Sequence, residues 1–257
     1  ALIRLDRLSD ELKHGAVLVS VLGANNELGT IQPVAEIARM CQNHGIPYHC
    51  DATQLTAHSL IDLTDCPLDY MTISGHKLYG PKGVGAVIVR DSDTLRPQVF
   101  GAGQEMKLRA GTENVPYIVG IAAAYRLLAE TFEERSSVEL SLRERLILRV
   151  LDEISDVRLT GARNKRLTNH ASFAFKNIDG LMLQSALDQR GFAVSVGSAC
   201  RSNEVRGQQQ LLEIGLGAEW VNGGLRITNG LYSTESSLDA LVDAIKEIVV
   251  SIWRMTS

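Results

Sequence analysis

The order of hydrophobic and polar positions predicts a strand followed by a helix near the start of the chain. Residues 16–21 form a continuous apolar run of strand length. Residues 33–44 then carry apolar side chains at the i, i+3, i+4 and i+7 spacing of one helix face: Val34, Ile37, Ala38 and Cys41. Pro33 is expected at the first helical position and Gly45 just past the last turn.

Three further segments of strand length follow this helix, at residues 46–50, 69–74 and 84–90, of which the last is the most apolar. The first of them ends at Asp51, and the second ends in the polar stretch 74–77. Alternation of strands with helices is typical of a parallel sheet wrapped by helices. We therefore expect an α/β domain.

The second half of the chain changes character. Small apolar residues at 115–132 predict a closely packed helix, and the charged run 130–145 is interpreted as a solvated helical face. We place a domain boundary near residue 133. Beyond it the pattern predicts a smaller α+β domain, with a strand at 171–175 and helices at 147–154, 181–190 and from Thr234 to the C-terminus.

Composition and charge narrow the class of protein. With 257 residues and 45% hydrophobic content, the chain can bury a core of one large or two unequal domains. A net charge of −4 argues against direct nucleic-acid binding. We see no apolar run of bilayer-spanning length and no signal peptide at the first residues, so we expect a cytoplasmic protein without membrane contact.

The four cysteines fall into two groups. Cys41, Cys50 and Cys66 lie in or beside apolar segments, and we expect buried, inert thiols there. Cys200 follows an apolar segment, 192–196, which we interpret as a strand, and precedes a polar stretch without helical periodicity. It is therefore expected on an exposed loop, where its thiol can be reached.

Polar side chains that can do chemistry follow the predicted strands. The carboxyl ends of parallel strands form the ligand-binding edge of such sheets. These residues are Asn26, Asp51, Gln54, Ser74, His76 and Lys77. Together they offer the amine, carboxylate and small donors that a cofactor with an aldehyde and a phosphate requires. On position alone, a solvated turn lysine is the favoured interpretation of Lys77.

Five motifs resemble those of the cysteine desulfurases of the NifS/IscS type, which are class-V aminotransferase relatives of PLP fold type I. The motifs are ANNELGTIQP at 24–33, HCDATQ at 49–54, SGHKLYGPKG at 74–83, RAGTEN at 109–114 and GSAC at 197–200. Their order and spacing agree over essentially the whole chain. The resemblance implies pyridoxal 5′-phosphate (PLP) as cofactor and L-cysteine as substrate.

The resemblance also assigns roles to the residues after the predicted strands. Lys77 would carry the cofactor through a Schiff base and Asp51 would face the pyridine nitrogen. Gln54 would lie near the ring hydroxyl, and Ser74 and His76 would bind the phosphate. Lys82 is the one rival to Lys77, but it lies in the 80–85 turn, which precedes a strand and lacks the ending of a phosphate loop.

Further residues are assigned to the substrate and to a partner subunit. Asn26, beside the cofactor, would bind the substrate carboxylate together with Arg226, whose planar fork suits a carboxylate. The family usually shows Phe-Ser-Leu after that arginine, whereas this chain has Ile-Thr-Asn. Thr112 would reach the cofactor phosphate of a second subunit, which implies a homodimer.

The implied reaction transfers the sulfur of L-cysteine to Cys200 as a persulfide and releases L-alanine. A sulfur-acceptor or scaffold protein would then collect the sulfur, for iron–sulfur cluster assembly, tRNA thiolation or DNA phosphorothioation. In this scheme residues 1–132 are the C-terminal part of the PLP-binding domain, and 133–257 form the small domain that carries the Cys200 loop.

Family members are longer, and we expect an N-terminal segment, on the same or a separate chain, to complete the cofactor site. None of the six histidines matches the one that the family stacks on the cofactor ring. We expect the 257 residues alone to bind PLP weakly or not at all. Two alternatives remain open: a non-catalytic scaffold of the same fold, and a related PLP enzyme such as a selenocysteine lyase or an aminotransferase.

Overall fold

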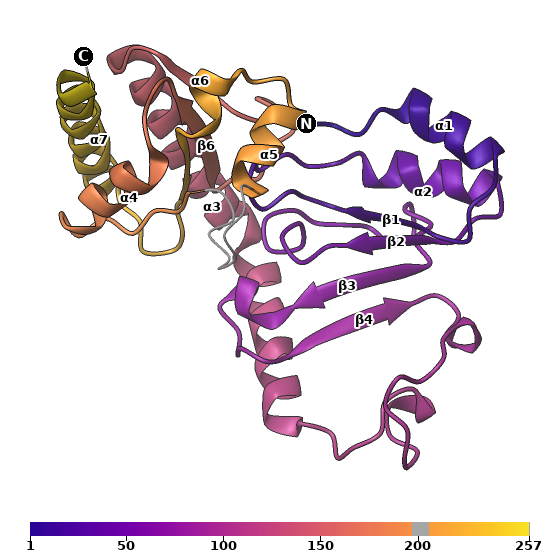
Figure 1. Cartoon of the computed structure of the whole chain (residues 1–257). Helices are drawn as coiled ribbons and strands as arrows, with labels where there is room; N and C mark the ends of the chain where they lie inside the picture. The colour runs from indigo at the N-terminus through magenta and orange to yellow at the C-terminus, as the bar shows by residue number, and fades with distance from the viewer. Residues whose placement is uncertain (197–205, 257) are drawn as a thin grey trace. The chain divides into compact units, whose positions relative to one another are not determined.

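The computed structural model describes residues 1–196 and 206–256, which divide into two compact units (Figure 1). The N-terminal unit contains Ile3–Ala24 and Gln32–Phe132. The C-terminal unit contains three stretches: Ala1–Leu2, Asn25–Ile31 and Glu133–Ser257. The predicted domain scheme, which placed 25–31 with the cofactor domain, stays a prediction.

A four-stranded sheet of order β1-β2-β3-β4 forms the centre of the N-terminal unit. Its strands are β1 (Val19–Leu22), β2 (Tyr48–Asp51), β3 (Tyr70–Ser74) and β4 (Gly85–Val89). The first three are parallel, and β4 runs antiparallel to β3. The predicted α/β sheet is therefore present, as a mixed and mostly parallel sheet.

Helix α2 (Val34–Asn43) packs on this sheet beside strand β2, and α1 (Leu5–Lys13) lies next to α2 (Figure 1). The four apolar side chains predicted to share one face of α2 are all buried. Gly45 has a positive φ of 65°, as expected after a helix end. Pro33 differs from the prediction, because it is the N-cap residue rather than the first helical residue.

A long helix, α3 (Val115–Glu153), contributes to both units. In the N-terminal unit Ala124 and Leu128 pack against Ala57 and Leu78. The close packing expected over 115–132 is only partly present, because apolar side chains such as Val119, which is 61% exposed, face outward. By length and composition alone α3 is the one helix among the described residues that could cross a membrane, a test that core helices of soluble proteins also pass.

The C-terminal unit is built on a three-stranded antiparallel sheet of order β5-β6-β7. Its strands are β5 (Val157–Leu159), β6 (His170–Phe175) and β7 (Gly224–Thr228). The helices α4 (Gly180–Asp188), α5 (Arg206–Glu213), α6 (Ala218–Val221) and α7 (Glu235–Thr256) follow or flank it. The Thr234 hydroxyl accepts a hydrogen bond from the Ser237 amide, which confirms the predicted start of the last helix.

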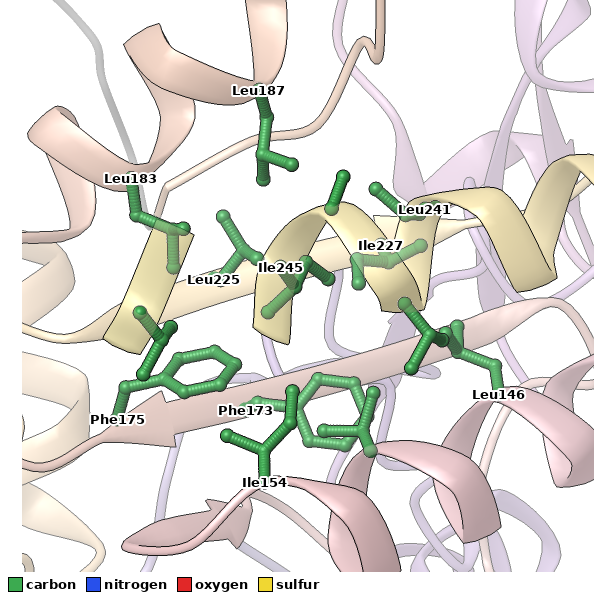
Figure 2. Close-up of a cluster of buried hydrophobic side chains, with 14 of the residues drawn as sticks. Leu146, Ile154, Phe173, Phe175, Leu183, Leu187, Leu225, Ile227, Leu241 and Ile245 are labelled. Carbon is green, nitrogen blue, oxygen red and sulfur yellow. The ribbon is translucent and has the colours of Figure 1, made fainter. Parts of the chain in front are cut away.

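Figure 2 shows the core of this unit, where side chains of α3, α4 and α7 meet those of β6 and β7. All six residues of the central strand β6 are buried. The rings of Phe173 and Phe175 lie 6.3 Å apart between their centroids. Because both faces of this strand are covered, its side chains are buried at every position instead of alternating between buried and exposed.

The charged run at 130–145 is a solvated face only in part, because one stripe of it is buried while other charged side chains, such as Glu130 and Glu133, are exposed. Arg135, Glu139 and Arg143 are buried, and their four-residue spacing places them on one face of α3. Arg135 pairs with Glu139 at 2.8 Å, and Arg143 donates to the carbonyls of Arg166 and Leu167 at 3.2 and 2.8 Å. Arg143 thus satisfies two backbone carbonyls of the irregular segment before β6, and Glu139 accepts from the hydroxyl of Thr168 in the same segment.

Two other expectations have clear outcomes. Cys41, Cys50 and Cys66 are buried and free, and burial raises the pKa of Cys50 to about 12, so the prediction of inert thiols is confirmed. The apolar segment 192–196 was expected to be a strand but makes only an isolated bridge, between Ser195 and Arg226. Its single pairing leaves β7 at the edge of the named sheet.

Candidate active site

The first group of predicted site residues lies in the N-terminal unit, where strands β2 and β3 end. Asp51 is the last residue of β2 and Ser74 the last residue of β3. These two strands are neighbours and run parallel, with Asp51 opposite Thr72. Their carboxyl ends therefore meet at one edge of the sheet, where ligands bind in folds of this class.

Lys77 lies in a short turn that begins immediately after β3. The residues 74–80, which we call the Lys77 turn, contain a 3₁₀ helix from Gly75 to Leu78. Gly75 donates its amide to the Val84 carbonyl and accepts from the Gly80 amide. Gly75 is buried, and a Cβ on it would come within 3.2 Å of the Pro81 carbonyl oxygen, so a larger residue would crowd the turn at this position.

The backbone holds this turn, and the Lys77 amine is left unpaired. Lys77 Nζ makes no hydrogen bond or ion pair with any residue that the structure describes. The Ser74 hydroxyl and the Nδ1 atom of His76 are hydrogen-bonded at 2.8 Å, and the His76 ring is otherwise exposed. A primary amine, a hydroxyl and an imidazole thus stand within four residues at the strand end.

Asp51 and Gln54 also keep hydrogen-bonding capacity for a ligand. Oδ1 of Asp51 accepts from the Thr53 amide at 3.0 Å. Within residues 1–196 and 209–254, its second oxygen and the Gln54 amide have no partner. This donor set fits PLP, which needs an amine for its aldehyde, an anion for its pyridinium nitrogen and donors for its phosphate.

Thr112 is exposed and, among the residues that the structure describes, makes no hydrogen bond with this group of residues. It follows the isolated bridge between Val99 and Arg109. No hydrogen bond in the described part of the chain joins it to the Lys77 turn. Its role toward the cofactor of a second subunit therefore stays a prediction.

The second group of predicted residues, Asn26 and Arg226, lies in the C-terminal unit. Arg226, on strand β7, donates from Nη1 to the Asn26 carbonyl oxygen at 3.1 Å. The backbone of Arg226 exchanges two hydrogen bonds with Ser195, at 2.6 and 3.0 Å. Arg226 Nε and Nη2 have no partner among the described residues, and these two atoms form the edge that grips a carboxylate in two parallel bonds.

Asn26 belongs to a tight turn, residues 25–31, which we call the Asn26 turn. The Asn25 side chain accepts from the amides of Glu27 and Leu28 at 2.9 and 2.8 Å, which closes the turn locally. Residues distant in sequence then attach it to the C-terminal unit. Arg166 donates from Nη1 to the Leu28 carbonyl at 2.8 Å, and His170 Nε2 hydrogen-bonds the Asn26 carbonyl at 3.1 Å.

Sequence reasoning missed Arg166 and His170. Both are buried. Arg166 also donates to the carbonyls of Thr160 and Ala162, and burial lowers its pKa to about 10. Burial likewise lowers the pKa of His170 to about 3. The available signal was a charged residue and a histidine directly before an apolar strand, but no local pattern connects them with residues 25–31.

Cys200, the predicted sulfur acceptor, lies outside the described residues. Its assignment rests on the GSAC motif at 197–200.

Comparison with known proteins identifies the family. Residues 1–241 match the family described as Aminotransferase class-V. The chain belongs to this family. Its fold is accordingly that of the fold-type I PLP-dependent enzymes, and the cofactor class implied by the motifs is PLP.

The curated relatives are cysteine desulfurases. The chain is 36% identical over 244 residues to cysteine desulfurase IscS of Dictyoglomus turgidum, covering 95% of this chain and 62% of that protein. It is 37% identical over 251 residues to the IscS of Methanosarcina thermophila, covering 98% and 62%. These matches confirm the resemblance that the five motifs carry. The chain thus spans about 62% of the length of these relatives.

A solved structure gives the same result. The NifS-like protein from Rickettsia africae superposes with a TM-score of 0.87 at 30% identity, covering 96% of this chain and 66% of the other. The arrangement of elements in this chain is therefore that of NifS-like proteins.

Proposed function

We propose that the protein containing this chain is a PLP-dependent cysteine desulfurase, which converts L-cysteine to L-alanine and transfers the sulfur to Cys200. The observation that carries the proposal is the unpaired amine of Lys77, directly after β3 and at the same sheet edge as Asp51. The curated relatives named cysteine desulfurase support the choice of reaction.

The Lys77 turn and the end of β2 supply the cofactor residues. PLP, when bound, withdraws electrons from the substrate carbon next to the amine. Lys77 would hold the cofactor aldehyde through its amine, and the same amine would be the base for the substrate α proton. Asp51 keeps the pyridine nitrogen protonated, Ser74 and His76 donate to the phosphate, and Gln54 donates near the ring hydroxyl.

Arg226 and Asn26 bind the substrate carboxylate. The free Nε and Nη2 atoms of Arg226 form two parallel hydrogen bonds with the two carboxylate oxygens. The Asn26 side chain, which is exposed, adds a neutral donor. This grip orients L-cysteine without itself taking part in bond breaking.

Cys200 acts as the sulfur acceptor. Its thiolate attacks the substrate sulfur, so that an S–S bond forms while the substrate C–S bond breaks. The electron pair of the broken bond stays with carbon, which takes up a proton and leaves as L-alanine. Cys200 keeps the sulfur as a persulfide, and a thiol of an acceptor protein then collects it.

The partners and location belong to the same proposal. We place the protein in the cytoplasm as a homodimer, with Thr112 reaching the cofactor phosphate of the second subunit. A sulfur-acceptor protein completes the reaction, and iron–sulfur cluster assembly is the favoured destination because relatives carry the name IscS.

The test incubates the complete, PLP-loaded protein with L-cysteine and measures alanine, sulfide and the mass of Cys200. We expect equal amounts of alanine and transferred sulfur, and a persulfide on Cys200. Cys200→Ser should stop sulfur transfer, whereas Cys66→Ala, at a buried thiol, should not. Keto acid without persulfide would indicate transamination, and no product at all would indicate a scaffold; either result overturns the proposal.

A further inference from the structure

The Asn26 carbonyl oxygen accepts two hydrogen bonds from side chains of the C-terminal unit. Arg226 Nη1 donates from strand β7 and His170 Nε2 from strand β6, each at 3.1 Å. A carbonyl oxygen has two lone pairs, so these donors occupy both. The Arg226 side chain and the His170 ring are thereby linked through one atom of the Asn26 turn.

His170 is fixed in place by the turn that it contacts. His170 is only 2% exposed. Gly29, at a positive φ of 71°, lies against the ring, and a Cβ on Gly29 would come within 2.4 Å of Nδ1. A side chain at position 29 would collide with the ring, so glycine is needed for this close approach.

The proton on the His170 ring has one possible location. Because a carbonyl oxygen can only accept, Nε2 must carry the hydrogen. Nδ1 is buried without a hydrogen-bond partner and faces Gly29, so it stays unprotonated. The low pKa of the buried ring agrees with this neutral form. His170 therefore works as a permanent neutral donor rather than as an acid or base.

We propose that His170 is a positioning residue for substrate binding, which acts through the Asn26 carbonyl to orient Arg226 and Asn26 toward the substrate carboxylate. The proposal rests on the desulfurase function proposed above. Arg226 uses Nη1 on this carbonyl and keeps Nε and Nη2 for the carboxylate. Without the His170 hydrogen bond the carbonyl can shift, and the guanidinium that it anchors shifts with it.

The test compares three variants of the complete, PLP-loaded protein. His170→Leu keeps an apolar side chain of similar size but has no donor, and His170→Asn has a donor that is too short to reach. His170→Gln places an amide where Nε2 lies and should restore the bond. Trp253→Phe is the matched control, because it removes a hydrogen bond from a ring nitrogen to a backbone carbonyl, that of Lys176 at 3.0 Å, at the other end of β6 from His170.

Kinetics with L-cysteine give the first readout. We expect His170→Leu and His170→Asn to raise KM about fivefold, the effect of one lost hydrogen bond, while kcat stays within about twofold. His170→Gln should return KM to the wild-type value, and Trp253→Phe should leave it unchanged. Equal KM values in wild type and His170→Leu, or failure of His170→Gln to rescue, would overturn the proposal.

Amide hydrogen exchange gives a readout that needs no activity. Exchange at residues 25–31 should be faster in His170→Leu and His170→Asn than in His170→Gln. If the wild-type enzyme forms no alanine from L-cysteine, the proposed function fails, and exchange still decides whether His170 holds the turn. Unchanged exchange in His170→Leu would refute the positioning role whatever the kinetics show.

Discussion

The Lys77 turn and the Asn26 turn hold predicted site residues in different ways. In the Lys77 turn, backbone hydrogen bonds around Gly75 set the conformation, and the side chain of Lys77 remains unpaired. The Asn26 turn is closed locally by Asn25, but it is also held by side chains from outside, those of His170, Arg166 and Arg226, which lie 138 to 200 positions away in sequence.

This difference separates two tasks that site residues perform. A group that must bond to a cofactor needs a side chain without other partners, so the fold fixes its backbone and leaves the side chain available. A group that must present a fixed surface to a carboxylate gains from buried donors that limit its movement. Substitutions in the Lys77 turn should therefore change the reaction rate, whereas substitutions of the residues that hold the Asn26 turn should change the stability of the protein and its affinity for substrate.

The largest effect should come from Lys77→Ala. Loss of the only amine assigned to the cofactor should lower alanine formation by at least about 10³-fold, with an unchanged unfolding midpoint, because the side chain has no partner to lose. Covalent capture of PLP after borohydride treatment, read by mass spectrometry, checks this. Lys82→Ala, in the exposed turn that follows, is the control and should still capture PLP. Capture of PLP by Lys77→Ala would show that another lysine bonds to the cofactor.

Arg166→Met, in contrast to Lys77→Ala, should cause a large loss of stability. Three carbonyl groups, of Leu28, Thr160 and Ala162, lose their buried donor, and we expect the unfolding free energy to fall by about 3 kcal/mol. Urea unfolding measures it. Arg163→Met, whose side chain is 43% exposed in its pair with Glu144, should cost less than about 1 kcal/mol. Similar losses of unfolding free energy in the two variants would show that Arg166 contributes no more to stability than an arginine at the surface.

His170 should make stability depend on pH. Its folded pKa is about 3 and its ordinary value 6.5, so between these values the unfolded chain binds a proton that the folded chain does not. Its contribution is complete above about pH 6.5 and is lost as pH falls, at up to about 1.4 kcal/mol per pH unit. Denaturant unfolding of wild type and His170→Gln at several pH values isolates this slope, and parallel curves would refute it.

The smallest effect on folding should come from His76→Ala. The ring is exposed and its one hydrogen bond, to Ser74, is also exposed, so the unfolding free energy should change by less than about 0.5 kcal/mol. PLP affinity, measured by titration, should nevertheless decrease because a phosphate donor is lost. Unchanged affinity with reduced stability would assign His76 a structural role instead.

The sequence alone determined the Lys77 turn, the strand ends beside it and the family. Apolar runs locate strands, and residues that follow parallel strands share an edge, so Asp51, Ser74 and Lys77 could be grouped without coordinates. The face of α2 and the buried thiols followed from the same local patterns.

Only the tertiary structure decided which side chains hold the Asn26 turn and which charges are buried. Arg166 and His170 approach residues 25–31 through a fold that closes across more than a hundred positions, and no local periodicity encodes such a contact. Arg135, Glu139 and Arg143 likewise have the pattern of a solvated face, yet they are buried because the segment before β6 offers carbonyls and a hydroxyl that need partners. Local sequence sets the period of a helix, whereas the neighbours that cover it decide whether its charges meet water or protein.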